Sequence, residues 1–192
     1  MKKALLTALK RYPVFTVRAI SDVLDVSRDY AYTVAYRLKK AGEIHEIEKG
    51  KYTMEEDAFL VASWITWPSY ISGWAALNYY KLTEQLPFTI HVVTTRKRKN
   101  KIIAYGNSRI EFIKIKESAF FGFRRVVYQN KEIFIAEEEK ALIDALATKK
   151  MSLGEARDII ENNKRKLNKT KLLSYAKITK GLAKKLKGFP YD

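Results

Sequence analysis

Basic and aromatic side chains recur together near the start of this 192-residue sequence, at a spacing that suits contact with nucleic acid. Arg28 would stand at the first position of a helix, with Tyr32 and Tyr36 following one turn apart from each other. An arginine can donate two hydrogen bonds to a guanine, and a tyrosine can reach bases, thymine methyl groups or phosphates. The set therefore predicts base contacts in duplex DNA. The alternative for the tyrosines is packing against a neighbouring element or a second copy of the chain.

Other side chains of the same region suit the phosphate backbone better than the bases. Lysine and arginine supply most such contacts, although any single one can equally be a solvated surface residue. Asp29 argues against indiscriminate backbone binding, because phosphates repel its carboxylate. A carboxylate is useful at such an interface when it accepts a hydrogen bond from a cytosine or orients an arginine. The predicted DNA-binding set is Arg28, Asp29, Tyr32, Thr33, Tyr36, Arg37, Lys39, Lys40, Lys49 and Lys51.

Acidic side chains offer a different chemistry, the metal-assisted cleavage of a phosphodiester. The candidates are Asp57, Glu111 and the run Glu138-Glu139-Lys140. Within this run, Glu138 and Lys140 have the spacing of a carboxylate-x-lysine pair. The glutamates at 137–139 would instead begin a helix, where the helix dipole favours anions without any catalytic role. We therefore expect no catalytic residue and no enzyme activity, and a metal-dependent nuclease is the weaker alternative.

Cysteine is absent from the sequence and histidine occurs only twice, as His45 and His91. The lack of cysteine excludes disulfides, thiolate metal sites and cysteine nucleophiles. Neither histidine has a partner at a metal-ligand spacing, so each is expected to pack or to face solvent. The sequence thus predicts neither a metal site nor a cofactor.

Three short helices would position the predicted DNA-binding residues. Apolar residues at helical spacing predict a first helix that stops at Pro13. Thr16 is expected to cap a second helix, and Ser27 a third one over 28–41, which Gly42 ends. The apolar face of the third helix is expected to consist of Ala31, Val34, Leu38 and Ala41.

A two-stranded hairpin is predicted directly after the third helix. Residues 43–48 and 51–54 alternate like strands, and the Lys49-Gly50 pair between them permits a tight turn. Two helices joined by a tight turn and followed by such a hairpin resemble the winged helix-turn-helix family, which lays its recognition helix into the major groove. Residues 1–54 are therefore expected to form a DNA-binding domain of this kind.

The remaining residues, 55–192, are expected to form a second and larger domain. Residues 69–74 should lead into a helix, and strand-like segments at about 88–136 follow one another without helices between them, which predicts an antiparallel sheet. The chain from 137 to 192 is expected to be helical, with helices over 137–148 and at about 152–162, 168–177 and 179–187. The predicted fold class is α+β.

The charge balance favours a polyanionic partner, because 37 Lys+Arg against 21 Asp+Glu leave a net charge of +16. From Lys164 to Asp192 there are ten Lys or Arg and one acidic residue, a run that could contact DNA, bind an acidic protein or be solvated. Anionic membrane is the competing partner. Since no apolar run reaches the roughly 18 residues that span a bilayer and no signal-peptide core is seen, a cytoplasmic protein without membrane contact is expected.

Four segments of the larger domain carry a family resemblance. They are residues 70–87, which begin Tyr70-Ile71-Ser72-Gly73-Trp74, then Ile90-His91-Val92-Val93-Thr94-Thr95, Phe120-Phe121-Gly122-Phe123, and 135–144, which include Ala136-Glu137-Glu138-Glu139-Lys140-Ala141. This ordered set resembles the AbiEi-type antitoxins, transcriptional regulators of viral defence systems. Together with the winged domain, the resemblance covers nearly the whole chain.

The resemblance implies a sequence-specific transcriptional regulator whose first domain binds inverted repeats of double-stranded DNA in its own promoter. A homodimer on the DNA is one way to occupy such a repeat, and the sequence leaves the oligomeric state open. The resemblance also implies that the larger domain opposes a nucleotidyltransferase toxin in a type IV toxin-antitoxin system that gives abortive infection. A solitary winged-helix transcription factor without a toxin is the alternative.

Overall fold

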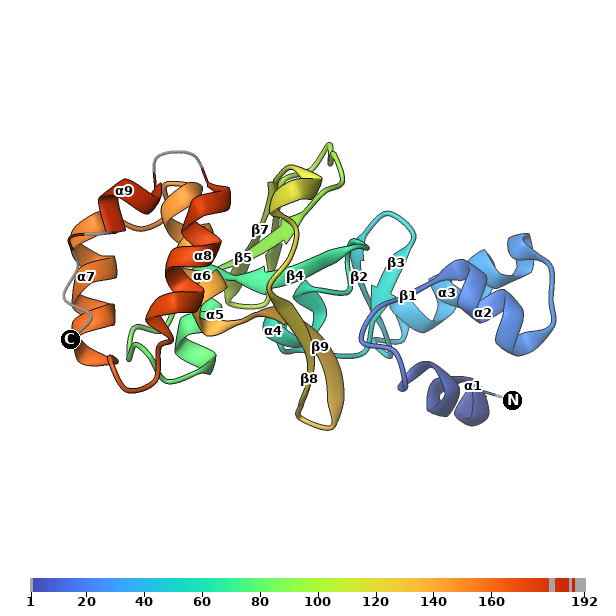
Figure 1. Ribbon diagram of the computed structural model, residues 1–192. Helices are drawn as coiled ribbons and strands as arrows, with labels where there is room; N and C mark the ends of the chain where they lie inside the picture. Colours follow the sequence, from blue (N-terminus) through green and yellow to red (C-terminus); the bar gives the residue numbers. More distant parts are fainter. Residues whose placement is uncertain (1, 180–181, 187, 189–192) are drawn as a thin grey trace.

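The computed structural model describes residues 2–179, 182–186 and 188, which form an α+β fold with two sheets (Figure 1). One buried apolar cluster lies among residues 5–52 and a second, larger one among residues 58–186. Met54 packs against the first cluster, while Ala58 belongs to the second. The predicted α+β class is therefore confirmed.

The first unit contains three helices and a small sheet in the strand order β1-β3-β2. Ser27 caps the third helix by accepting a hydrogen bond from the Tyr30 amide, and Gly42 follows it at φ 71°, as the sequence predicts. Thr16 stands at the start of the second helix, but its side chain makes no capping hydrogen bond. The elements are α1 (Lys2–Leu9), β1 (Phe15–Thr16), α2 (Val17–Leu24), α3 (Arg28–Lys40), β2 (His45–Glu48) and β3 (Lys51–Thr53).

The larger sheet has six strands in the order β6-β7-β5-β4-β9-β8 and is mixed, which corrects the predicted antiparallel sheet. The pairs β4–β9 and β5–β7 are parallel, and Ile71 lies opposite Ile135 in the first of them. The elements are α4 (Ala58–Ala62), β4 (Ser69–Ser72), α5 (Gly73–Tyr79), β5 (Thr89–Thr94), β6 (Ile102–Tyr105), β7 (Ser108–Lys114), the 3-10 turn Glu117–Ala119, β8 (Phe123–Tyr128) and β9 (Lys131–Ala136).

Strand β4 is where the structure departs most from the sequence-based expectation, which treats residues 69–74 as the lead into a helix. All four residues of β4 are buried, so the segment lacks the alternation of apolar and polar residues that marks a half-exposed strand. Its position between β5 and β9 makes it a central strand and extends the sheet beyond residues 88–136.

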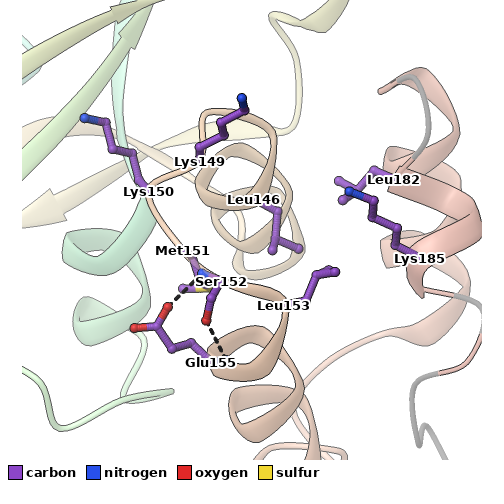
Figure 2. A pocket seen from close by; sticks show the side chains of 9 residues that line it. All are labelled: Leu146, Lys149, Lys150, Met151, Ser152, Leu153, Glu155, Leu182 and Lys185. Atoms are coloured by element: carbon purple, nitrogen blue, oxygen red, sulfur yellow. Dashed lines mark hydrogen bonds between the residues drawn. The ribbon is translucent and has the colours of Figure 1, made fainter.

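Helices follow the sheet, as predicted: α6 (Glu138–Ala147), α7 (Leu153–Asn162), α8 (Lys169–Ile178) and α9 (Leu182–Leu186). Residues 180, 181 and 187 of the last predicted helix lie outside the described residues. Figure 2 shows a hollow in which Leu182 of α9 lies across from Leu146 and Leu153, beside the capping box that Ser152 and Glu155 form at the start of α7. Among the described residues, no helix has both the length and the apolar character that crossing a membrane requires.

The hairpin of β2 and β3, here called the wing, lies between α3 and the larger sheet (Figure 1). Ile47 of the wing packs on the larger apolar cluster. Arg98 Nη2 donates to Glu48 Oε2 at 2.5 Å, and Lys51 Nζ donates to the carbonyl oxygen of Ile65 at 2.5 Å. The wing is thus fixed against the larger domain, and the region of these contacts is called the junction below.

Candidate nucleic-acid interface

The solvent-facing side of α3 presents a polar and aromatic strip. The buried residues of this helix are Ala31, Ala35 and Leu38. The predicted apolar face is thus corrected at one position, because Ala41 is exposed and Ala35 is buried instead. Helical geometry places four exposed residues in line on the opposite side: Asp29, Thr33, Tyr36 and Lys40. Tyr36 is 66% exposed, which leaves its ring free to reach a ligand surface.

One edge of α3 borders the wing. Lys39 Nζ lies 2.5 Å from Glu46 Oε2 of β2, and Arg28 and Tyr32 share this edge by helical spacing. The hydrogen bond from Lys39 lowers the pKa of the Glu46 carboxyl, with burial acting in the opposite sense. Lys39 is therefore engaged with the wing, whereas Arg28 and Tyr32 are exposed.

The other edge of α3 faces α1. Arg37 lines a shallow hollow with Tyr30, Val34 and Leu5, away from the wing. The structure thus separates Arg37 from the strip that carries Tyr36, although both were predicted as one set. A phosphate contact by Arg37 would require the DNA backbone to pass on the α1 side.

The two wing lysines have different surroundings. Lys49 is exposed in the turn between β2 and β3 and has no ion pair within the residues that the structure describes. Lys51 is only partly exposed, and its ammonium donates to Glu48 Oε1 at 2.7 Å and to the Ile65 carbonyl. Lys49 is therefore exposed at the tip of the wing, while Lys51 belongs to the junction.

These surroundings predict different outcomes for two alanine variants. If Lys49 contacts a DNA phosphate, Lys49→Ala should reduce the slope of log affinity for duplex DNA against log salt concentration by roughly one unit, because that contact is lost. Lys51→Ala should leave that slope unchanged and lower the free energy of unfolding by about 1 kcal/mol, because it removes hydrogen bonds at the junction. Fluorescence anisotropy at several salt concentrations and urea unfolding would measure the two effects. A reduced slope for Lys51→Ala alone would reverse the assignment.

A basic loop between β5 and β6 was missed in the sequence analysis. Residues 96–101 read Arg96-Lys97-Arg98-Lys99-Asn100-Lys101 and connect two strands of the larger domain. The high density of positive charge in this loop can be read from the sequence. The position of the loop beside the wing cannot, because it depends on the tertiary contact between Arg98 and Glu48 at the junction.

The five residues considered for metal-assisted cleavage have separate partners, and Glu139 pairs with Lys171 at 3.2 Å. Asp57 caps α4 through the Phe59 amide, and Glu111 pairs with Lys150 at 2.7 Å. Glu138 pairs with Arg124, and Lys140 is buried against Asp144. Within the described residues, no group of three or more His, Asp or Glu side chains could hold a metal ion. The structure therefore does not bring these candidates together as one site.

The histidines lie in unlike environments. His45 is exposed on β2, whereas His91 is buried in β5 with its Nε2 3.6 Å from Glu111 Oε2. Burial lowers the pKa of the His91 imidazole, with Glu111 acting in the opposite sense, so the ring is expected to be neutral near pH 7. Its Nδ1 lies close to Gly73, where an added Cβ would approach it to 3.3 Å. These contacts describe a packed histidine.

The segments that carry the family resemblance meet around Tyr70 in the core of the larger domain. The Tyr70 ring stacks on Phe123 at 4.6 Å, and its hydroxyl donates to Asp144 Oδ2 at 3.0 Å. Ser72 also donates to this carboxylate, and the buried Lys140 ammonium donates to its other oxygen. Burial raises the pKa of the Asp144 carboxyl even though these donors act to lower it. These side chains of the resembling segments therefore have a packing role in this chain.

No protein-family model matches this sequence, and no curated protein matches it either.

Proposed function

We propose that this protein is a sequence-specific DNA-binding transcriptional regulator. The observation that carries the proposal is the exposed strip of α3, a serine-capped helix that presents Tyr36 and Lys40 beside a wing. A helix presented in this way can enter the major groove, with its side chains against base edges and the wing against the backbone. The net charge of +16 supports the same partner, since it attracts polyanions over long distances.

A regulator of this kind would act in the cytoplasm, and we propose that two copies bind an inverted repeat. Once the recognition helix of one copy is bound, the helix of a linked second copy is held at a high effective concentration near the other half of the repeat. Binding is thereby strengthened without new base contacts. The resemblance to AbiEi-type antitoxins extends the proposal to control of the protein's own promoter and to opposition of a nucleotidyltransferase toxin. An adjacent gene for such a toxin would support this extension, and its absence would favour a solitary regulator.

The proposal is tested by comparing alanine variants on the exposed strip and wing-side edge of α3 with one on its α1 side. Tyr36→Ala and Arg28→Ala should each weaken binding to a preferred duplex by about 1–3 kcal/mol while leaving the affinity for random duplex nearly unchanged. Tyr30→Ala is the matched control, because Tyr30 is also exposed but lies on the α1 side. The preferred duplex would come from the region upstream of the gene or from selection on a random library, and electrophoretic shifts would give the affinities.

Two outcomes would contradict this assignment. Equal losses on preferred and random duplex would show that Tyr36 and Arg28 contact only the backbone. An equal loss of preference for Tyr30→Ala would show that the α1 side of α3 faces the DNA.

A further inference from the structure

A cleft of about 580 Å³ opens where β5 and β7 end. These strands are parallel neighbours, so Thr94 and Lys114 lie opposite each other at the same edge of the sheet. The carboxyl ends of parallel strands are the usual place for a ligand crevice in open sheets, and here the basic loop 96–101 closes one side. The lining includes six cations, Arg96, Lys97, Arg98, Lys101, Lys114 and Lys150.

Two of the six cations are already neutralised. Arg98 donates to Glu48 and Thr66, lies over the Phe112 ring at 4.0 Å, and its side chain is only 11% exposed. Lys150 pairs with Glu111. Their positions are thus fixed by contacts within the protein.

The other four cations of the cleft, Arg96, Lys97, Lys101 and Lys114, are exposed and form no ion pair within the described part of the chain. Charges of one sign that line a hollow reinforce each other's potential and concentrate anions there. The cleft therefore has an electrostatic potential that attracts a ligand with several negative charges.

The form of the cleft favours a nucleic-acid backbone over a small anion. A small-molecule site usually encloses its ligand with a few fixed polar groups, whereas these four side chains are solvent-exposed. Contact with successive phosphates, independent of base sequence, needs only a row of flexible lysine and arginine side chains. Arg98 in the middle of the basic loop binds Glu48, which directly precedes Lys49 of the wing turn. The exposed cations of the cleft therefore continue toward Lys49 along one side of the molecule.

We propose that this cleft binds backbone phosphates of the same duplex that α3 contacts, on the far side of the wing. The inference rests on the proposed function and extends the DNA interface from the winged unit onto the larger domain. Four phosphate contacts should contribute roughly 3–4 units to the slope of log affinity against log salt concentration.

The test uses the full chain with Arg96, Lys97, Lys101 and Lys114 all changed to Ala. A control variant carries Lys10→Ala, Lys81→Ala, Arg109→Ala and Lys149→Ala, which removes the same charges from exposed positions outside the cleft, outside the predicted DNA-binding set and outside the basic run that begins at Lys164. Both variants are titrated with preferred and random duplex at several salt concentrations, and thermal unfolding checks that each is folded. The cleft variant should lose roughly 3–4 units of slope on both duplexes and keep its sequence preference, while the control changes by less than about one unit.

An unchanged slope for the cleft variant, or equal changes in both variants, would overturn the inference. A second arm measures calorimetric binding of inorganic tripolyphosphate. If the cleft variant loses tripolyphosphate binding but keeps the DNA slope of the unaltered protein, the cleft is a small-anion site and the inference is wrong. Failure of the proposed function would look different, because the unaltered protein would then show no preference between duplexes.

Discussion

An Asp144→Ala variant is expected to lose about 3–5 kcal/mol of the free energy of unfolding, because it leaves a buried ammonium without its acceptor. Lys140 is 1% exposed, and Asp144 also accepts from the hydroxyls of Tyr70 and Ser72. Truncation at Asp144 therefore leaves three buried donors without this partner at once, each at a cost. Urea unfolding at pH 7, followed by circular dichroism, would measure the loss.

Two further variants serve as a control and as a rescue of this loss of stability. Asp158→Ala, at an exposed position of α7, should change the free energy of unfolding by no more than about 0.5 kcal/mol. The double variant Lys140→Met/Asp144→Leu should recover part of the loss, because apolar side chains can replace a buried ion pair. A loss of less than about 1 kcal/mol for Asp144→Ala would show that the ammonium finds another partner.

Arg98→Ala should lower the free energy of unfolding by about 2–3 kcal/mol, since one side chain supplies a charge-assisted hydrogen bond and a ring contact at the junction. Arg96→Ala is the matched control, because Arg96 is exposed two residues away and should change stability by no more than about 0.5 kcal/mol. Hydrogen exchange should show the Arg98→Ala loss as faster exchange in β2. Equal protection of β2 in both variants would mean that the wing does not depend on this contact.

The pH dependence of the Arg98→Ala effect provides an independent check. Burial acts to raise the pKa of the Glu48 carboxyl, but hydrogen bonds from Lys51 and Arg98 outweigh it and the pKa lies below its ordinary value of 4.5. A lowered folded-state pKa contributes stability that is present above the unfolded value and is lost as the pH falls through the folded value. The difference between the unaltered protein and Arg98→Ala should therefore shrink as the pH falls below about 4.5.

Much of the winged unit was predictable because its signals are local. Pro13 lies between α1 and β1, Ser27 caps α3, and Gly42 has the left-handed backbone that terminates a helix. The turn at Lys49-Gly50 likewise depends only on neighbouring residues, and Gly50 has φ 79°. Each of these features follows from a few consecutive side chains.

The mixed sheet and the junction could not be predicted in the same way. Burial on both faces hides the strand character of residues 69–72, and the partner of Ile71 comes from a distant part of the sequence. The inward position of Lys51 also depends on Ile65 of the other domain. Charge patterns alone therefore could not separate Lys51, which is engaged at the junction, from Lys49, which is exposed in the turn of the wing.

The pairing of Ile71 with Ile135 has a consequence for synthesis of the chain on the ribosome. Every strand pair of the first unit is complete by residue 53, whereas β4 must wait for β9, 64 positions after Ile71. At ordinary translation rates this delay is roughly 3–13 s, during which β4 lacks one of its neighbours and exposes apolar surface. We expect the nascent larger domain to depend on chaperones over that interval, while the winged unit is already able to fold.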